Sequence, residues 1–166
     1  DNVYVFPNYL EKLEFEVFDI YGVSFESEYC RSSIIEGFVV DNPQKINLLA
    51  IHGDLVGIGG QSAYNPITAQ ALEQSGADYV ALGHVHSFGG IQKAGKTYFA
   101  YPGIPEGRGF DEQGPKGVII GDVYKNYVDL TFVPTAKRQF HEIDVDVSSC
   151  VSNLDICQEI LSADTN

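Results

Sequence analysis

Three of the four histidines in this 166-residue chain stand where they could bind a metal ion. His52 follows the apolar run INLLAI, whereas His84 and His86 follow the apolar run DYVAL. Residues i and i+2 of an extended chain point to the same side, so His84 and His86 can face one cavity. One histidine alone is more often structural or solvent-facing, but three at coordinated positions predict a site for Zn, Mn or Fe.

The two apolar runs predict the strands that would position these histidines. Residues 46–52 and 77–84 are rich in Val, Ile, Leu and Ala, which is typical of strands buried on both faces. Between them, Pro66 predicts the start of a helix over 67–76. Strand, helix and strand together form a βαβ unit, in which the carboxyl ends of the parallel strands share one edge of the sheet. We therefore expect the three histidines at that edge.

The rest of the chain predicts an α/β fold in which antiparallel hairpins accompany the βαβ unit. Residues 89–103 predict a hairpin that turns at Ala94-Gly95, and residues 116–135 predict a second that turns at Lys125-Asn126. Weaker patterns predict strands at 3–6, 13–25 and 138–147, a turn at 8–12, and helices at 30–38 and 148–163.

Composition narrows the functional classes. The net charge of −13 argues against a role in coating DNA, although metal ions and a local basic group can hold phosphate in an acidic protein. The cysteines Cys30, Cys150 and Cys157 lack metal-binding spacing and indicate reduced thiols in a cytoplasmic protein. No apolar run approaches about 18 residues, so no membrane partner is expected. The chain begins with Asp1 and contains no Met, which favours a piece of a longer protein.

The residues around the histidines also resemble a known family. The stretches IHGD (51–54), ADYVALGHVH (77–86) and YPGIPEGRGFDEQGPKGVIIGDV (101–123) are similar to the C-terminal half of the catalytic domain of calcineurin-like metallophosphoesterases. Within that family the resemblance is to the DNA-repair exonuclease branch, of the SbcD and YhaO type, and it covers residues 1–145. Residues 146–166 resemble the start of a cap domain or a linker, and from 148 onward we expect a poorly anchored helix or disorder.

The resemblance implies a β-sandwich flanked by helices that holds two divalent metal ions, with Mn favoured and Fe or Zn also suited to histidine ligands. His52 and His84 would bind one metal and His86 the other, and these three would be the catalytic residues. The metals would activate a bridging hydroxide and neutralise charge on the phosphoryl oxygens. The implied activity is phosphodiester hydrolysis, as a DNA exonuclease in the full-length protein. DNA or another phosphodiester would be the substrate and an ATPase subunit a candidate partner.

The chain departs from the family at its N-terminal motifs. It contains no Asp-x-His and no Gly-Asn-His-Asp, the motifs that supply the remaining metal ligands. We therefore expect the chain alone to bind metal weakly and to lack substantial phosphoesterase activity. Two alternatives remain open: an enzyme for small phosphoesters, which the acidic charge favours, and a non-catalytic interaction module with a partial metal site.

Two further residues are weaker candidates. Arg108, in a loop rich in Gly and Pro, could contact a substrate phosphate, although pairing with Glu106 or Asp111 is the commoner role for such an arginine. Asp54 could orient His52 from behind, or it could simply belong to a turn.

Overall fold

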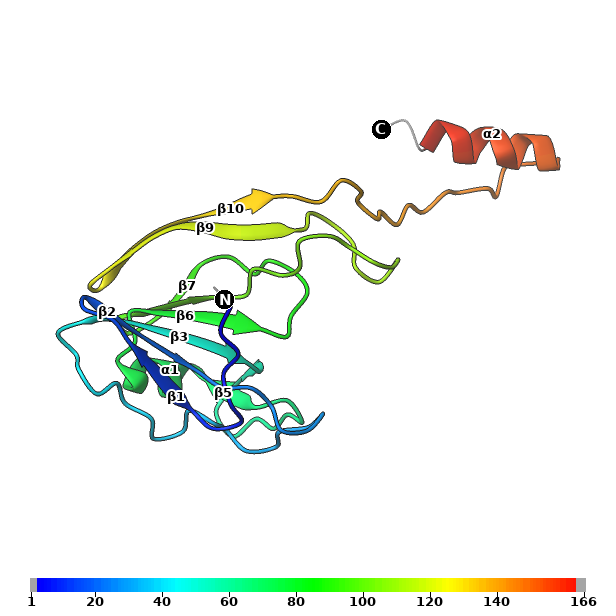
Figure 1. The fold of residues 1–166 in the computed structure, drawn as a ribbon. Helices are drawn as coiled ribbons and strands as arrows, with labels where there is room; N and C mark the ends of the chain where they lie inside the picture. The colour runs from blue at the N-terminus through cyan, green and yellow to red at the C-terminus, as the bar shows by residue number, and fades with distance from the viewer. Residues whose placement is uncertain (1–2, 164–166) are drawn as a thin grey trace.

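The computed structural model describes residues 3–163, and expectations for residues 1–2 and 164–166 lie outside the described part. A six-stranded sheet in the order β1-β2-β3-β6-β8-β7 dominates the fold (Figure 1), which confirms the α/β class. Strands β2, β3, β6 and β8 are parallel, whereas β1 and β7 are antiparallel edge strands. The elements are β1 Glu11–Glu14, β2 Phe18–Gly22, β3 Ile46–His52, β4 Asp54–Val56, β5 Pro66–Thr68, α1 Ala69–Ser75, β6 Tyr79–Gly83, β7 Gln92–Ala94, β8 Thr97–Ala100, β9 Gly117–Tyr124, β10 Tyr127–Pro134 and α2 Asn153–Ala163.

The predicted βαβ unit is present as β3, α1 and β6. Strands β3 and β6 are direct parallel neighbours, and His52 stands opposite Gly83. The start of the helix differs from the prediction, because Thr68 and not Pro66 caps α1, and its hydroxyl accepts a hydrogen bond from the Ala71 N–H at 3.0 Å. Pro66 instead belongs to β5, which pairs with β4, so the helix can begin only after that short strand.

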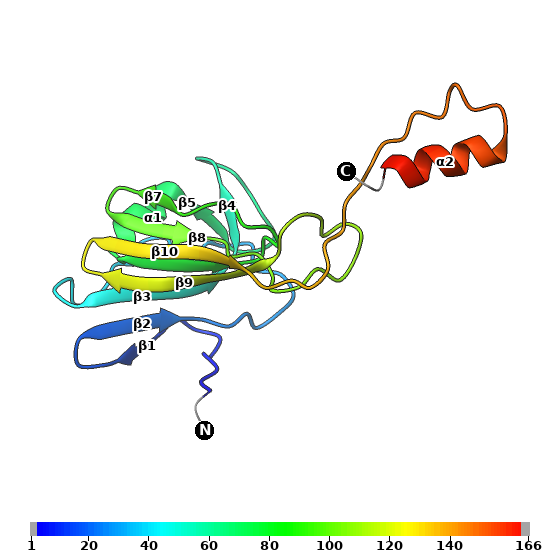
Figure 2. The same cartoon turned by 90° about the horizontal axis from the view of Figure 1, so that it is seen from above.

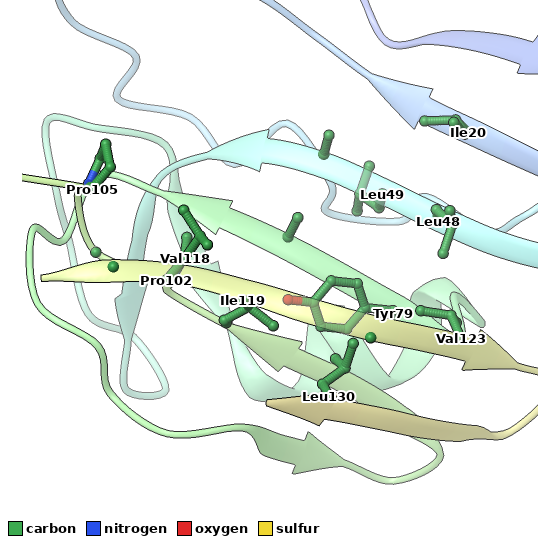
Figure 3. A pocket seen from close by; sticks show the side chains of 15 residues that line it. Ile20, Leu48, Leu49, Tyr79, Pro102, Pro105, Val118, Ile119, Val123 and Leu130 are labelled. Carbon is green, nitrogen blue, oxygen red and sulfur yellow. The ribbon is translucent and has the colours of Figure 1, made fainter. Parts of the chain in front are cut away.

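Only one face of the central sheet is closely packed. Ile51 and Leu82 are buried with Leu72 of α1 in the main core. On the other face Ala50 and Ala81 are exposed, so the prediction that both strands are buried on both faces is wrong. The reason is that the β9–β10 hairpin stands off from this face and leaves a mainly apolar cavity of about 530 Å³ between them (Figure 3).

Both predicted hairpins are present, although the first turns at Gly95-Lys96, one residue later than predicted. In the first, Ala94 pairs with Thr97, and in the second Tyr124 pairs with Tyr127. The second hairpin lies across the face of the sheet opposite to α1 (Figures 1 and 2). Its turn is fastened to the sheet, because Lys125 Nζ donates to Asp78 Oδ2 at 2.9 Å and the following N–H donates to Asp78 Oδ1 at 2.8 Å.

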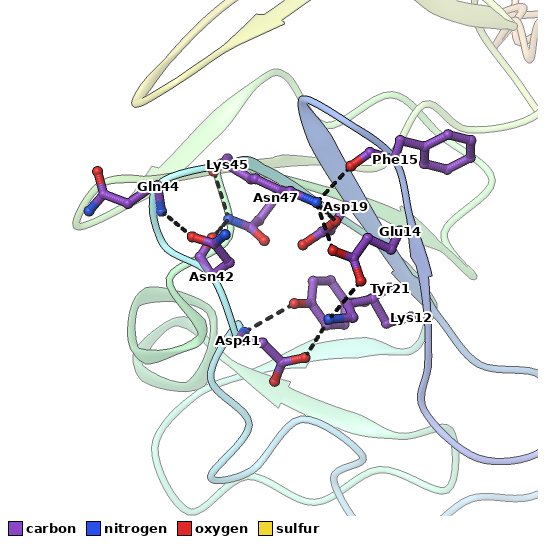
Figure 4. Close-up of polar contacts among 10 residues, drawn as sticks. All are labelled: Lys12, Glu14, Phe15, Asp19, Tyr21, Asp41, Asn42, Gln44, Lys45 and Asn47. Atoms are coloured by element: carbon purple, nitrogen blue, oxygen red, sulfur yellow. Dashed lines mark hydrogen bonds and ion pairs between the residues drawn. The ribbon is translucent and has the colours of Figure 1, made fainter.

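Buried charges line the amino ends of the parallel strands. Asp78, directly before β6, also accepts a hydrogen bond from the Asn47 N–H at 2.8 Å. Asp19 in β2 is 1% exposed and lies 3.0 Å from Lys45 Nζ. The same ammonium group reaches Glu14 Oε1 at 3.0 Å (Figure 4). This amino edge therefore contains opposite charges that neutralise one another.

Several weaker predictions differ from the structure. Residues 3–6 form no strand, and the run 13–25 folds back on itself because the Phe15 N–H donates to Phe18 O at 3.0 Å. The resulting hairpin places β1 at residues 11–14, partly within the predicted turn at 8–12. Residues 30–38 form turns instead of a helix, since tertiary contacts such as Ile34 N–H to Asn65 Oδ1 occupy their backbone. Residues 138–147 contain no strand and are largely exposed.

Helix α2 confirms the helix predicted within 148–163. None of its residues is buried, and Figures 1 and 2 show it beyond the sheet, at the end of an extended segment. The prediction of a separate unit at 146–166 stays a prediction. No helix among residues 3–163 is long and apolar enough to cross a membrane.

Candidate metal centre

His52 and His84 lie side by side at the carboxyl edge of the sheet. His52 ends β3, and His84 directly follows β6. The distance between His84 Nδ1 and His52 Nε2 is 3.2 Å, and the two rings meet edge to face. The parallel βαβ unit thus joins two histidines from distant parts of the chain, as the sequence predicts.

The backbone at this edge is adapted to the close approach of the rings. His84 has a φ of 116°, which residues with a side chain rarely adopt. Such a conformation costs about 1–3 kcal/mol, persists only where the surroundings impose it, and is most frequent at functional sites. Opposite His52, a Cβ on Gly83 would lie 3.1 Å from His52 Nδ1, so glycine gives the ring the room it needs.

Buried polar side chains hold the end of β3. Asn65 is fully buried, donates from Nδ2 to His52 O at 2.8 Å, and accepts from the Ile34 N–H through Oδ1. The Tyr101 hydroxyl donates to Gly53 O at 2.6 Å. These bonds fix two successive peptides, the one that joins His52 to Gly53 and the one that joins Gly53 to Asp54.

Electrostatics keep His52 in its neutral form. Burial lowers the pKa of His52, the nearby His84 and His86 lower it further, and Asp54 partly opposes them. The residue is exposed at the sheet edge, but the atoms packed around its ring still reduce the ring's hydration. A lowered pKa leaves the imidazole uncharged at neutral pH, which is the form that binds metal.

Asp54 lies beside His84 and not beside His52. Its Oδ1 is 3.5 Å from His84 Nε2, and its Oδ2 accepts a hydrogen bond from Ser62 Oγ at 2.8 Å. Two roles were considered for Asp54, orienting His52 or belonging to a turn. The structure does not support the first, because the turn after β3 carries the carboxylate to the ring of His84. A carboxylate on one nitrogen of a histidine leaves the other nitrogen for a metal. Here that other nitrogen is Nδ1, the one that faces His52.

His86 faces the loop that precedes β9. Its Nδ1 lies 2.7 Å from Glu112 Oε1, and Glu112 Oε2 accepts a hydrogen bond from the Arg108 N–H at 2.6 Å. Glu106, an expected partner of Arg108, lies instead 3.5 Å from Arg138 Nε. One carboxylate therefore connects His86 to the backbone of Arg108, whose side chain is exposed.

The His52–His84 pair fits a divalent metal ion. Two imidazole nitrogens that bind one metal at about 2.1 Å lie roughly 3.0–3.4 Å apart, and the pair here is separated by 3.2 Å. Imidazoles next to a carboxylate form a donor set that Mn, Fe and Zn accept. Within residues 3–163, however, no group of three or more His, Cys, Asp or Glu residues is gathered to hold a metal ion. These residues thus provide a partial site, and metal binding by His52, His84 and His86 stays a prediction.

Several residues that shape this edge were not among the predicted site residues. Glu112 lies in the stretch GRGFDE, four residues after Arg108, and an acid so close to a candidate phosphate ligand was a signal that could have been weighed. Asn65 and Lys116 gave no signal, because both residue types are mostly exposed in proteins. Here both are buried.

Comparison with known proteins finds a distant relative. Over 154 residues the chain is 27% identical to the "Uncharacterized metallophosphoesterase YhaO" of Bacillus subtilis (strain 168). The match covers 89% of this chain but 38% of the relative, so the chain spans well under half of that protein's length. No family model matches the chain. The chain is thus similar, at low identity, to a protein described as a metallophosphoesterase.

Proposed function

We propose that this chain carries part of the metal centre of a phosphoester hydrolase. His52 and His84 would hold one divalent metal ion, and His86 would hold a second. The observation that carries this proposal is the 3.2 Å separation between His84 Nδ1 and His52 Nε2, at a sheet edge where α/β proteins bind their ligands. The similarity to a metallophosphoesterase supports the same reaction class.

Bound metal ions would supply a nucleophilic hydroxide and neutralise charge on phosphorus-bound oxygens. Residues of the chain would orient the metal ligands and bind the substrate. Asp54 and Glu112 would orient the rings of His84 and His86 through the contacts described above. Arg108, exposed on the loop that Glu112 fixes, would bind a phosphate oxygen of the substrate.

For the whole protein we propose metal-dependent phosphodiester hydrolysis, with Mn as the metal, DNA as the substrate of an exonuclease, and the cytoplasm as its location. An ATPase subunit is a candidate partner. A second candidate is an enzyme for small phosphoesters, which the net charge of −13 favours because it repels a polyanion. Single-stranded DNA and p-nitrophenyl phosphate, compared as substrates of the whole protein, separate the two. Preferential degradation of DNA supports the exonuclease, and preferential release of nitrophenol supports the alternative.

The isolated chain provides a direct test. We expect it to bind Mn²⁺ weakly and not to hydrolyse bis-p-nitrophenyl phosphate, because it lacks the Asp-x-His and Gly-Asn-His-Asp motifs. The measurement is a Mn²⁺ titration during which hydrolysis is followed. Robust turnover would contradict the view that the chain holds only part of the site. Complete failure to bind Mn²⁺ or Zn²⁺ would overturn the assignment of a metal centre.

A further inference from the structure

We propose that Glu112 and Lys116 are positioning residues that hold His86 in the orientation needed to present its Nε2 atom to a metal ion. This inference rests on the proposed function for the metal, but the orientation itself can be tested without one. Both residues come from the loop before β9, which passes behind the turn that carries His86.

Glu112 determines which nitrogen of His86 carries the proton. Its carboxylate is almost completely buried, and each oxygen is used: Oε1 contacts His86 Nδ1 at 2.7 Å, and Oε2 accepts from the Arg108 N–H at 2.6 Å. A glutamate side chain is ordinarily ionised at neutral pH. An ionised carboxylate can only accept hydrogen bonds, so His86 Nδ1 must donate. The lone pair of the neutral ring then lies on Nε2, on the opposite side from Glu112.

Lys116 fixes the backbone of the same residue. It is 2% exposed, and both acceptors that the structure gives its ammonium group belong to the histidine turn: His86 O at 2.9 Å and Ser87 Oγ at 3.4 Å. Burying a charged lysine is costly unless its donors are satisfied. A lysine beneath a turn of this kind therefore indicates that the turn must keep one conformation.

The chain also packs directly against the turn from behind. A Cβ added to Gly103 would lie 3.1 Å from His86 O and from the backbone of Ser87 and Phe88. The turn is thus held in three ways. The backbone at Gly103 packs behind it, the Lys116 ammonium group binds the His86 carbonyl, and the Glu112 carboxylate contacts the His86 ring. His52 and His84, by contrast, contact each other, and neither has a buried carboxylate on its ring.

The first test concerns the metal-free protein. Long-range ¹⁵N–¹H NMR spectra at alkaline pH, where imidazoles are neutral, distinguish the two tautomers of each histidine. We expect His86 to carry its proton on Nδ1 in the wild-type chain and to lose that preference in Glu112→Ala. Asp111→Ala removes the adjacent, exposed carboxylate and is the matched control. A wild-type His86 protonated on Nε2 would overturn the proposal even if no variant folds.

The second test measures metal affinity by calorimetric titration with Zn²⁺, which binds imidazole more tightly than Mn²⁺ does. Loss of a group that orients a ligand typically weakens binding about 10–100-fold. We expect this range for Glu112→Ala, about tenfold for Lys116→Met, and less than about twofold for Asp111→Ala. Glu112→Gln keeps one acceptor oxygen and should be intermediate.

The outcomes distinguish the metal centre from the orientation of His86. A wild-type chain that binds no Zn²⁺ but shows the Nδ1–H tautomer refutes the metal centre and leaves the orientation of His86 intact. A wild-type chain that binds Zn²⁺ with the same affinity as Glu112→Ala and Lys116→Met, both folded by their amide spectra, refutes the positioning role and leaves the metal centre intact.

Discussion

The two edges of the six-stranded sheet hold their polar side chains in opposite ways. At the amino edge, Asp19 and Asp78 each face a lysine, so the charges cancel within the protein. At the carboxyl edge, His52 and His84 face each other, and His84 adopts a strained backbone conformation to do so. The first edge pairs opposite charges, although Asp19 Oδ2 and Asn47 Oδ1 are buried without a hydrogen-bond partner. The second edge brings two groups of the same kind together.

The amino edge therefore contributes to the stability of the fold, whereas the carboxyl edge carries the proposed metal ligands. Buried opposite charges that make several hydrogen bonds hold the strands and the hairpin turn together, and removing one partner leaves the other unsatisfied. Two adjacent imidazoles, one of them on a residue with a positive φ, add little to the stability of the fold. In the proposed function, these two rings would hold a cation between them.

The largest expected effect is at the amino edge. Asp78→Ala would leave the Asn47 and Asn126 N–H groups without their acceptor. It would also remove the carboxylate partner of the Lys125 ammonium group, which would keep only the Lys45 carbonyl. We expect the free energy of unfolding to fall by about 3 kcal/mol, measured by urea denaturation. Asp129→Ala, an exposed position on β10, is the control and should change it little. If Asp78→Ala also weakened Zn²⁺ binding tenfold, the two edges would not be independent and the comparison would fail.

An intermediate effect is expected at the carboxyl edge. His84→Ala and His84→Gly should both weaken Zn²⁺ binding, on the order of 100-fold, because each removes a proposed metal ligand. Glycine accepts a φ of 116° without strain, so His84→Gly should be about 1 kcal/mol more stable than His84→Ala. Calorimetry and urea denaturation measure the two quantities. A glycine variant that is less stable than the alanine variant would show that this backbone is not strained.

The smallest effect concerns pH. Hydrogen bonds to Glu14 and then to Asp19 raise the pKa of Lys45. A raised pKa means that the stabilisation is complete below the ordinary lysine value of about 10.4 and is lost as the pH rises through the folded value. The difference in unfolding free energy between wild type and Lys45→Met should therefore stay constant from about pH 7 to 9 and shrink above about pH 10. A difference that already shrinks between neutral pH and pH 9 would contradict this account.

The central architecture was predictable because its signals are local. The apolar runs before His52 and His84 and the Lys125-Asn126 turn each depend on a few adjacent residues, and the structure confirms the elements that they predict. The N-terminal hairpin was missed because a tight turn at Phe15 interrupts a run that looks continuous in sequence. The open face behind Ala50 was missed because no local pattern reveals how far another hairpin stands from a sheet.

The candidate site also has a part that local sequence patterns predicted and a part that they did not. The pairing of His52 with His84 followed from the parallel strands, whereas the contact of His86 with Glu112 depends on the path of a Gly- and Pro-rich loop that no periodicity describes. Asp54 was not expected beside His84 for a related reason. Its position in the chain is next to His52, but the turn after β3 brings its side chain to His84.

The β9–β10 hairpin has a further consequence, because it is attached at both ends of its first strand. β9 is eight residues long, begins directly after Lys116 and ends directly before Lys125. One ammonium group sits on the carbonyl of His86 and the other on Asp78. The number of residues in β9 therefore fixes the distance between its two attached ends on the open face of the sheet. Each residue adds about 3.3 Å to that distance. Deleting one residue from β9 would leave one lysine in place and draw the other out of hydrogen-bonding reach. The length of this strand therefore determines the position of the turn that carries His86.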